Sequence, residues 1–178
     1  MVAVPAPSIE ENRANSVFDA LLWSLSRPGL KRALPGEGEA LIVEALIDRE
    51  CSVFCADTFL IPLVLRTGAH IVELPQADHA FLGSVKSADV LRELNRGSDL
   101  YPDDGATAIV QVSFGLGQRL RFSGPGVEVP LELELAGLPN GFWETRTQIM
   151  RYPMGFDLFL LDGPDIVGVP RSTIVEVI

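Results

Sequence analysis

The segment from Thr107 to Phe114, TAIVQVSF, leaves few folds open to this chain. Its residues are almost all apolar or β-branched, and it lacks the alternation of apolar and polar side chains that a strand with one wet face shows. A continuous run of this kind is typical of a central strand covered on both faces. We therefore expect a sheet with other elements packed on both sides of this segment.

The N-terminal part of the chain carries the pattern of an amphipathic helix. Ser8 and Glu11 form a capping-box pattern, in which each side chain can accept a bond from the other's main-chain N–H. The helix is expected to stop before Pro28 and Gly29, since proline disfavours helical geometry at the preceding residue. Its apolar positions, expected to form one stripe, are Val17, Phe18, Leu21, Leu22 and Leu25.

Helices and strands then alternate. The predicted helices span residues 39–47, run from Asp57 or Thr58 to Thr67, run from Ser87 to a close at Gly97, and run from Asn140 through Met150. The predicted short strands are SVFCA and HAFLG, whereas residues 70–76 fit no single state. This order of elements favours one α/β domain with a mixed β-sheet flanked by helices, spanning residues 1–178 with residues 1–8 as a flexible arm.

Strand patterns dominate the later part of the chain. Gly115-Leu116-Gly117 is interpreted as a turn, which leads into RLRFS, a half-exposed strand with Arg119 and Arg121 on one face. PLELEL alternates strictly, as an edge strand does. Three C-terminal segments, DLFLL, DIVGV and TIVEV, have the composition of strands, and the Asp162-Gly163-Pro164 turn favours an antiparallel hairpin between the first two.

Charge and hydropathy limit the classes of partner. The chain has 24 acidic and 14 basic side chains, a net charge of −10, so it should repel nucleic-acid backbones. No apolar run reaches the roughly 18 residues needed to cross a bilayer, and the N-terminus lacks the pattern of a signal peptide, so we expect a cytoplasmic protein. A mean hydropathy of +0.26 indicates surplus apolar surface, which predicts a protein interface.

Few residues are candidates for chemistry. Cys51 and Cys55 would lie about 13 Å apart on one strand, too far for a disulfide, and no metal-ligand cluster accompanies them. His79 with Asp78 is the one adjacent histidine–acid pair, although neighbours in a strand point to opposite faces. Lys31 and Lys86 both lie among turn residues, where solvent keeps the amine protonated. Neither is therefore expected to anchor a cofactor.

Arginine supplies twelve of the fourteen basic side chains. Guanidinium groups suit two-point contacts to carboxylate or phosphate, so Arg119, Arg121 and Arg171 are candidates for a partner or anion contact. Ion pairing at the surface is the simpler interpretation of these arginines, because the chain has 24 acidic side chains with which they can pair. The residues alone thus predict no catalytic constellation, no metal site and no cofactor.

Several segments, in this order, resemble one family. They are VFDALLWSLSRPG, GATAIVQV, RLRFSGPG, YPMGFDLFLLDG and VGVPRSTIVEV. Each is weak alone, but their order over about 160 residues is similar to that of the PhnH family, whose members belong to the bacterial carbon–phosphorus lyase system for phosphonate use. The match points to three turns, 27–29, 124–126 and 170–173, and within the last to Arg171.

The resemblance implies a non-catalytic structural subunit of the carbon–phosphorus lyase core complex, made with subunits G, I and J. That complex forms ribose 1-phosphonate 5-triphosphate from ATP and a phosphonate, with release of adenine. The resemblance further implies a homodimer in isolation and a fold similar to pyridoxal-phosphate-dependent transferases, without their cofactor or lysine. Fold similarity does not imply transferase activity in this chain.

Two other functions remain open on the sequence. The first is a small-molecule enzyme whose site uses His79 with Asp78 or Arg119. The second is a pyridoxal-phosphate protein, which the two lysines make the weaker alternative.

Overall fold

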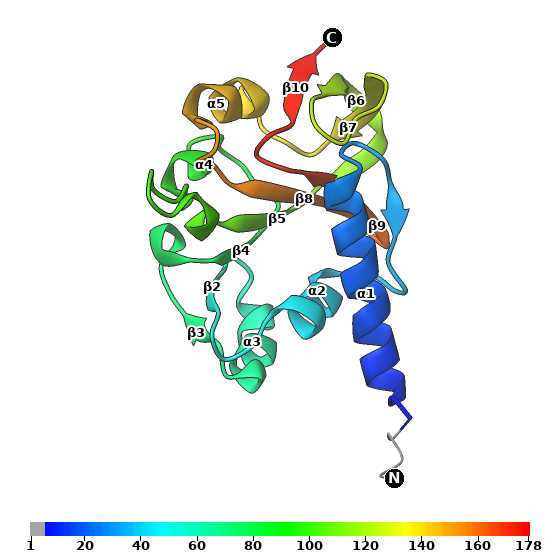
Figure 1. The fold of residues 1–178 in the computed structure, drawn as a ribbon, viewed down its shortest axis with the longest axis vertical. Helices are drawn as coiled ribbons and strands as arrows, with labels where there is room; N and C mark the ends of the chain where they lie inside the picture. The colour runs from blue at the N-terminus through cyan, green and yellow to red at the C-terminus, as the bar shows by residue number, and fades with distance from the viewer. Residues whose placement is uncertain (1–5) are drawn as a thin grey trace.

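The computed structural model describes residues 6–178 and contains two β-sheets with helices around them (Figure 1). The helices are α1 (Ile9–Ser26), α2 (Glu39–Leu46), α3 (Ile61–Thr67), α4 (Val90–Glu93) and α5 (Phe142–Ile149), with 3-10 turns at Thr58–Leu60, Leu74–Gln76 and Pro102–Asp104. The strands are β1 (Arg32–Ala33), β2 (Ser52–Cys55), β3 (His70–Ile71), β4 (His79–Gly83), β5 (Thr107–Gln111), β6 (Ser113–Ser123), β7 (Leu131–Ala136), β8 (Asp157–Asp162), β9 (Asp165–Val169) and β10 (Ile174–Val177). The predicted 1–8 arm falls partly on residues 1–5, outside the described part, and Ser8 belongs to the cap of α1.

The larger sheet has seven strands in the order β1-β9-β8-β5-β4-β2-β3. Strands β3, β2, β4, β5 and β8 run parallel. Beyond β8, β9 is antiparallel to β8, and β1 is in turn antiparallel to β9. The prediction of an α/β fold with a mixed sheet is confirmed. Strand β5 is central, as predicted: Ala108 and Val110 pack into the core on one face, and Ile109 packs into the core on the other. The predicted run Thr107–Phe114 is nevertheless divided, because β5 ends at Gln111 and Ser113 and Phe114 open β6 in the second sheet.

The two faces of this sheet are covered by different kinds of layer. Helices α1, α2 and α3 bury side chains such as Leu21 and Val43 against one face. The other face packs on α4, α5 and the second sheet, through side chains such as Phe122 and Phe142. Figure 1 shows α1 running beside β9, and α5 near the second sheet at the end where the C-terminus lies.

The second sheet, in the order β10-β6-β7, corrects the expectation of a single sheet. The β8–β9 hairpin is antiparallel as predicted. The last strand, β10, does not belong to the larger sheet and pairs with β6 in the second sheet. Strand β7 is an edge strand, as its alternation predicts. Gly115 and Gly117 do not form a turn: they lie within β6 as a bulge, because Leu135 of β7 pairs with both Phe114 and Gln118.

The helical predictions hold with three corrections. The first is that α5 begins at Phe142 with Gly141 at its N-cap, so Asn140 is not the cap. Ser8 accepts from the Glu11 N–H at 3.1 Å and the Glu11 side chain accepts from Ser8, so the capping box is present. Helix α4 is only four residues long, far shorter than the predicted 87–97. The stripe on α1 is also split, because Val17 and Leu21 are buried whereas Phe18 and Leu22 are 50% and 55% exposed. No helix in the described part of the chain has the length and apolar character that a bilayer span requires.

Candidate functional site

The carboxyl ends of the parallel strands bring together polar groups that the sequence patterns did not connect. Strand β2 leads through α3 to β3 on one side, whereas β4 lies on its other side, so the strand order reverses between β2 and β4. Open α/β sheets bind ligands at such a reversal. The side chain of Glu39, the first residue of α2, lies at this edge and accepts from Gln111 Nε2 at 3.3 Å.

Glu39 is a buried acid with incomplete hydrogen bonding. It is 6% exposed, and no described group bonds its Oε1 atom. Burial raises the pKa of this carboxyl, and its bonds to Gln111 and to the main chain of Gly83 only partly oppose that rise. Burial, together with the charges of Glu39 and Asp57, raises the pKa of the nearby Cys55 thiol to about 11. Cys55 is therefore a protonated thiol at neutral pH and not a nucleophile.

The structure separates His79 from Arg119 and leaves Asp78 as its charged neighbour. His79 begins β4, whereas Arg119 lies on β6 of the second sheet. The Asp78 carboxylate is occupied, since it accepts from the Ser52 N–H at 2.9 Å. His79 Nδ1 is buried with no partner among described atoms, and burial lowers the pKa of this imidazole. The arrangement favours a neutral histidine.

The three candidate arginines lie in two different settings. Arg119 and Arg121 project from β6 and both pair with Glu132 of β7, at 2.5 and 3.1 Å, on an exposed surface. Arg171 is half-buried in the loop between β9 and β10, where its Nη2 lies 2.8 Å from Asp157 Oδ2. Its guanidinium also donates to the carbonyls of Pro102 and Gly105. Arg171 therefore links its own loop to the start of β8 and to the Pro102–Gly105 segment.

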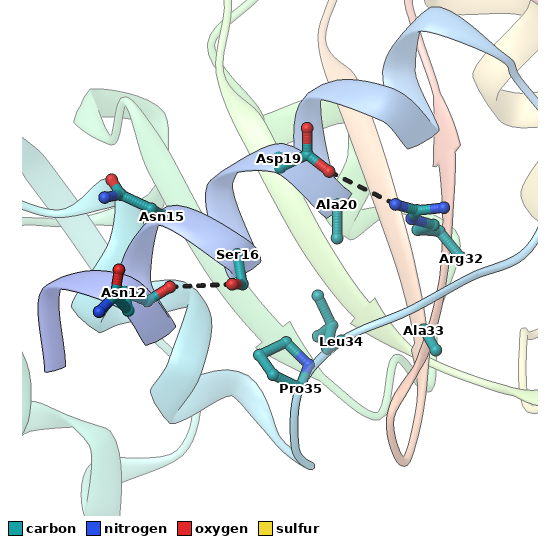
Figure 2. Close-up of a pocket in the computed structure, with 9 residues that line it drawn as sticks. All are labelled: Asn12, Asn15, Ser16, Asp19, Ala20, Arg32, Ala33, Leu34 and Pro35. Carbon is teal, nitrogen blue, oxygen red and sulfur yellow. Dashed lines mark hydrogen bonds and ion pairs between the residues drawn. The ribbon is translucent and has the colours of Figure 1, made fainter. Parts of the chain in front are cut away.

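A cavity of about 610 Å³ forms a groove, lined by both polar and apolar side chains, between α1 and the segment that contains β1. Figure 2 shows Asn12, Ser16 and Asp19 along one face of α1, opposite Arg32 and Pro35. The Arg32 guanidinium lies 3.4 Å from the Asp19 carboxylate, which closes one end of the groove. The lining offers amide and hydroxyl hydrogen bonds but no histidine, cysteine or lysine.

The thiols and Lys31 have acidic neighbours, but these groups do not form a larger cluster in the described part of the chain. Among residues 6–178, no group of three or more histidine, cysteine, aspartate or glutamate side chains is placed to hold a metal ion. Cys51 and Cys55 are free thiols, as predicted. The Lys31 Nζ atom lies 3.8 Å from Asp165 Oδ2 and also lies over the ring of Phe114.

Comparison with known proteins adds what the geometry alone does not give. The family model described as "Bacterial phosphonate metabolism protein (PhnH)" matches residues 8–176. The chain belongs to the PhnH family. A relative from Stutzerimonas stutzeri, named "Putative C-P lyase subunit protein HtxG", is 29% identical over 189 residues, which cover 97% of this chain and 93% of the relative. The match to the PhnH model spans both sheets, so the resemblance drawn from the ordered motifs is confirmed.

Two buried charged residues escaped the sequence analysis of this PhnH-family chain. Arg146 is 3% exposed on the inner face of α5, and its position three residues after Trp143 and four after Phe142 places it on an apolar helical stripe. That spacing is a signal which could have identified it. Glu39 carried no such signal, because its burial depends on the approach of β4 and β5 from much later in the chain.

Proposed function

We propose that this chain is a structural, non-catalytic subunit of a carbon–phosphorus lyase core complex that acts in phosphonate catabolism. The observation that carries the proposal is the family match over residues 8–176, together with a relative of nearly equal extent whose name describes a C-P lyase subunit. The proposed role places the chemistry, conversion of ATP and a phosphonate to ribose 1-phosphonate 5-triphosphate, in the assembled complex. Subunits G, I and J are the proposed partners, and the proposed location is the cytoplasm.

An exposed apolar strip on α1 supports a subunit role. Phe18 and Leu22 are four residues apart, so they form one strip on the outer side of the helix. Trp23 lies beside this strip, with the guanidinium carbons of Arg27 and Arg32 within 5.2 and 5.1 Å of its ring centroid. A strip with an apolar centre and an arginine–aromatic border has the composition of a protein interface. We further propose that the chain alone forms a homodimer.

Co-expression tests the proposal directly. The chain is produced alone and then with subunits G, I and J, and native mass is measured in each case. We expect a dimer alone and a larger stoichiometric complex with the partners. A chain that stays separate from all three partners would overturn the subunit proposal.

The non-catalytic part has its own test. The purified chain is incubated with ATP and a phosphonate, and free adenine is measured. We expect none, whereas adenine release by the chain alone would favour the alternative of a small-molecule enzyme. The proposed resemblance to pyridoxal-phosphate transferases without cofactor predicts that added pyridoxal phosphate produces no bound chromophore.

A further inference from the structure

A second cavity, of about 440 Å³, opens between α5 and β10. Met150, Ile174 and Val175 form much of its apolar wall, and Arg146 and Arg171 are its charged members. Apolar cavities with a few convergent polar groups are the usual form of a small-molecule site. The two arginines therefore decide what such a cavity can hold.

Arg146 is a buried cation without a carboxylate of its own. Its Nη1 donates to the Thr173 carbonyl at 2.9 Å and its Nη2 donates to the Pro170 carbonyl at 2.8 Å, and both acceptors are neutral. Its Nε has no partner, and no acid lies within 4.0 Å of the guanidinium among residues 6–178. A buried charge is costly unless an opposite charge accompanies it.

Charge balance near the cavity leaves one positive charge uncompensated. Asp157 is the acid whose charge acts on Arg146, but both of its carboxylate oxygens already accept from Arg171. One carboxylate thus serves two guanidinium groups. Burial lowers the pKa of Arg146 to about 10, so the group stays charged at neutral pH.

Other features around α5 add to this positive region. The Thr173 hydroxyl, in the wall of the same cavity, is buried and has no described partner. Arg96 and Arg151 line a neighbouring cavity of about 400 Å³ that also borders α5, and neither has an ion pair within 4.0 Å in the described part of the chain. Among the described residues, the linings of the two cavities thus include four arginines and no aspartate or glutamate, in a chain whose net charge is −10.

We propose that the cavity between α5 and β10 binds a small organic oxyanion, with its anionic group beside Arg146 and its apolar part against Met150, Ile174 and Val175. The anion supplies the charge that Asp157 cannot supply to both arginines. Arginine's fixed fork of donors suits carboxylate and phosphoryl groups alike. This site belongs to the isolated chain, so it stands or fails independently of the proposed subunit role.

A purely structural role for Arg146 makes a different prediction. Its two carbonyl contacts tie α5 to the Pro170–Thr173 turn, and a residue that acts only in this way would stabilise the fold without binding any ligand. Ligand binding by the folded chain therefore distinguishes the two roles.

Isothermal titration of the purified full chain with phenyl phosphate, inorganic phosphate and phenol tests the site. We expect phenyl phosphate to bind at least about tenfold more tightly than either other probe, because only phenyl phosphate combines charge with an apolar ring. Ile174→Glu places a negative charge at the cavity wall on a side chain that is 58% exposed, so it should leave folding intact and weaken binding about fivefold. Val129→Glu, at an exposed position outside this cavity's lining, is the matched control and should bind as the unchanged chain does.

Arg146→Met removes the charge at nearly constant length and should abolish binding wherever the variant folds. If it does not fold, the comparison of Ile174→Glu with Val129→Glu still decides the matter. Absence of phenyl phosphate binding, or equal binding by the unchanged chain and Ile174→Glu, would overturn the proposal.

Discussion

Arg171 and Asp157 are joined by three hydrogen bonds from one residue to one carboxylate. The main-chain N–H of Arg171 donates to Asp157 Oδ1 at 2.7 Å, and its side-chain Nε and Nη2 donate to Oδ1 and Oδ2 at 3.3 and 2.8 Å. Asp157 begins β8, and Arg171 follows β9. The pair therefore fixes where the chain leaves the larger sheet for the smaller one.

Replacement of Arg171 by alanine should be strongly destabilising. It leaves the half-buried Asp157 carboxylate unpaired and frees the Pro102 and Gly105 carbonyls, so we expect the free energy of unfolding to fall by about 2–3 kcal/mol. Urea unfolding measures the change. Arg121→Ala is the matched control, because its pair with Glu132 is exposed and should contribute under about 1 kcal/mol. Equal losses in the two variants would show that the Arg171 pair is no more than a surface contact.

Gly168→Ala should disrupt the packing of α1 on β9. A Cβ atom at this position would lie 2.6 Å from the carbonyl carbon and oxygen of Ser24, which are main-chain atoms that cannot rotate away. We expect a loss of about 2–3 kcal/mol in the free energy of unfolding, measured by urea titration. Gly163→Ala is not a suitable control because its φ is +56°, whereas Gly36→Ala meets only a flexible leucine side chain. Similar stability of the Gly168 and Gly36 variants would contradict the close approach.

His79 should make stability depend on pH. Burial depresses its pKa in the folded chain, so the unfolded chain takes up the proton first as pH falls. Its stabilising effect is complete above the unfolded pKa of about 6.5 and is lost as pH falls from there towards the lower pKa of the folded chain. Chemical unfolding across this range should therefore show a steeper loss in the unchanged chain than in His79→Gln. His70→Gln, at an exposed site, should keep the original slope, and a His79 variant with that same slope would refute the explanation.

Glu39→Gln should have the opposite pH dependence. The raised pKa of Glu39 means that the folded chain holds its proton more tightly than the unfolded chain, so the carboxyl costs stability as pH rises above its unfolded pKa of about 4.3. Removing the charge should raise stability by on the order of 1 kcal/mol at pH 7 and leave it nearly unchanged near pH 4. Thermal unfolding at both pH values measures the difference, and a gain of equal size at both would rule out ionisation as its cause.

Phe18→Asp combined with Leu22→Asp tests the exposed strip on α1. Both side chains are about half exposed, so the isolated chain should keep its fold, whereas association through the strip should weaken at least about tenfold. Native mass with and without the proposed partners measures association. Phe59→Asp, on the most exposed large apolar side chain, is the control and should associate normally. Undiminished association of the double variant would place the interface elsewhere.

Local chemistry allowed much of the fold to be predicted. The Ser8–Glu11 cap, the strand over residues 107–111 and the alternation of β7 each depend on neighbours in sequence, and each is confirmed. Apart from the overestimated length of α4, the main errors concern long-range pairing. A Gly-x-Gly segment suits both a turn and a bulge, and only the register of β6 against Leu135 decides between them.

The candidate site was harder to predict for the same reason. Arg171 was recognised through its motif, but its partner Asp157 lies fourteen residues earlier, and Arg146 became notable only once the Pro170–Thr173 turn was seen to surround it. Likewise, the spacing of Phe18 and Leu22 fits an apolar stripe on a helix as well as that of Leu21 does, so the sequence does not show which of them is buried. The sheet covers only part of the surface of α1, and tertiary packing determines which of its apolar side chains are buried.

The position of β8 between β5 and β9 has a consequence for synthesis on the ribosome. The larger sheet cannot be completed until residues 157–169 have emerged from the ribosome, because β8 joins the parallel strands to the antiparallel pair β9 and β1. Until then α1, β1 and the apolar face of β5 lack their final cover. The nascent chain therefore carries unprotected strand edges through most of its translation, and a chaperone that shields apolar segments should increase the yield of folded protein.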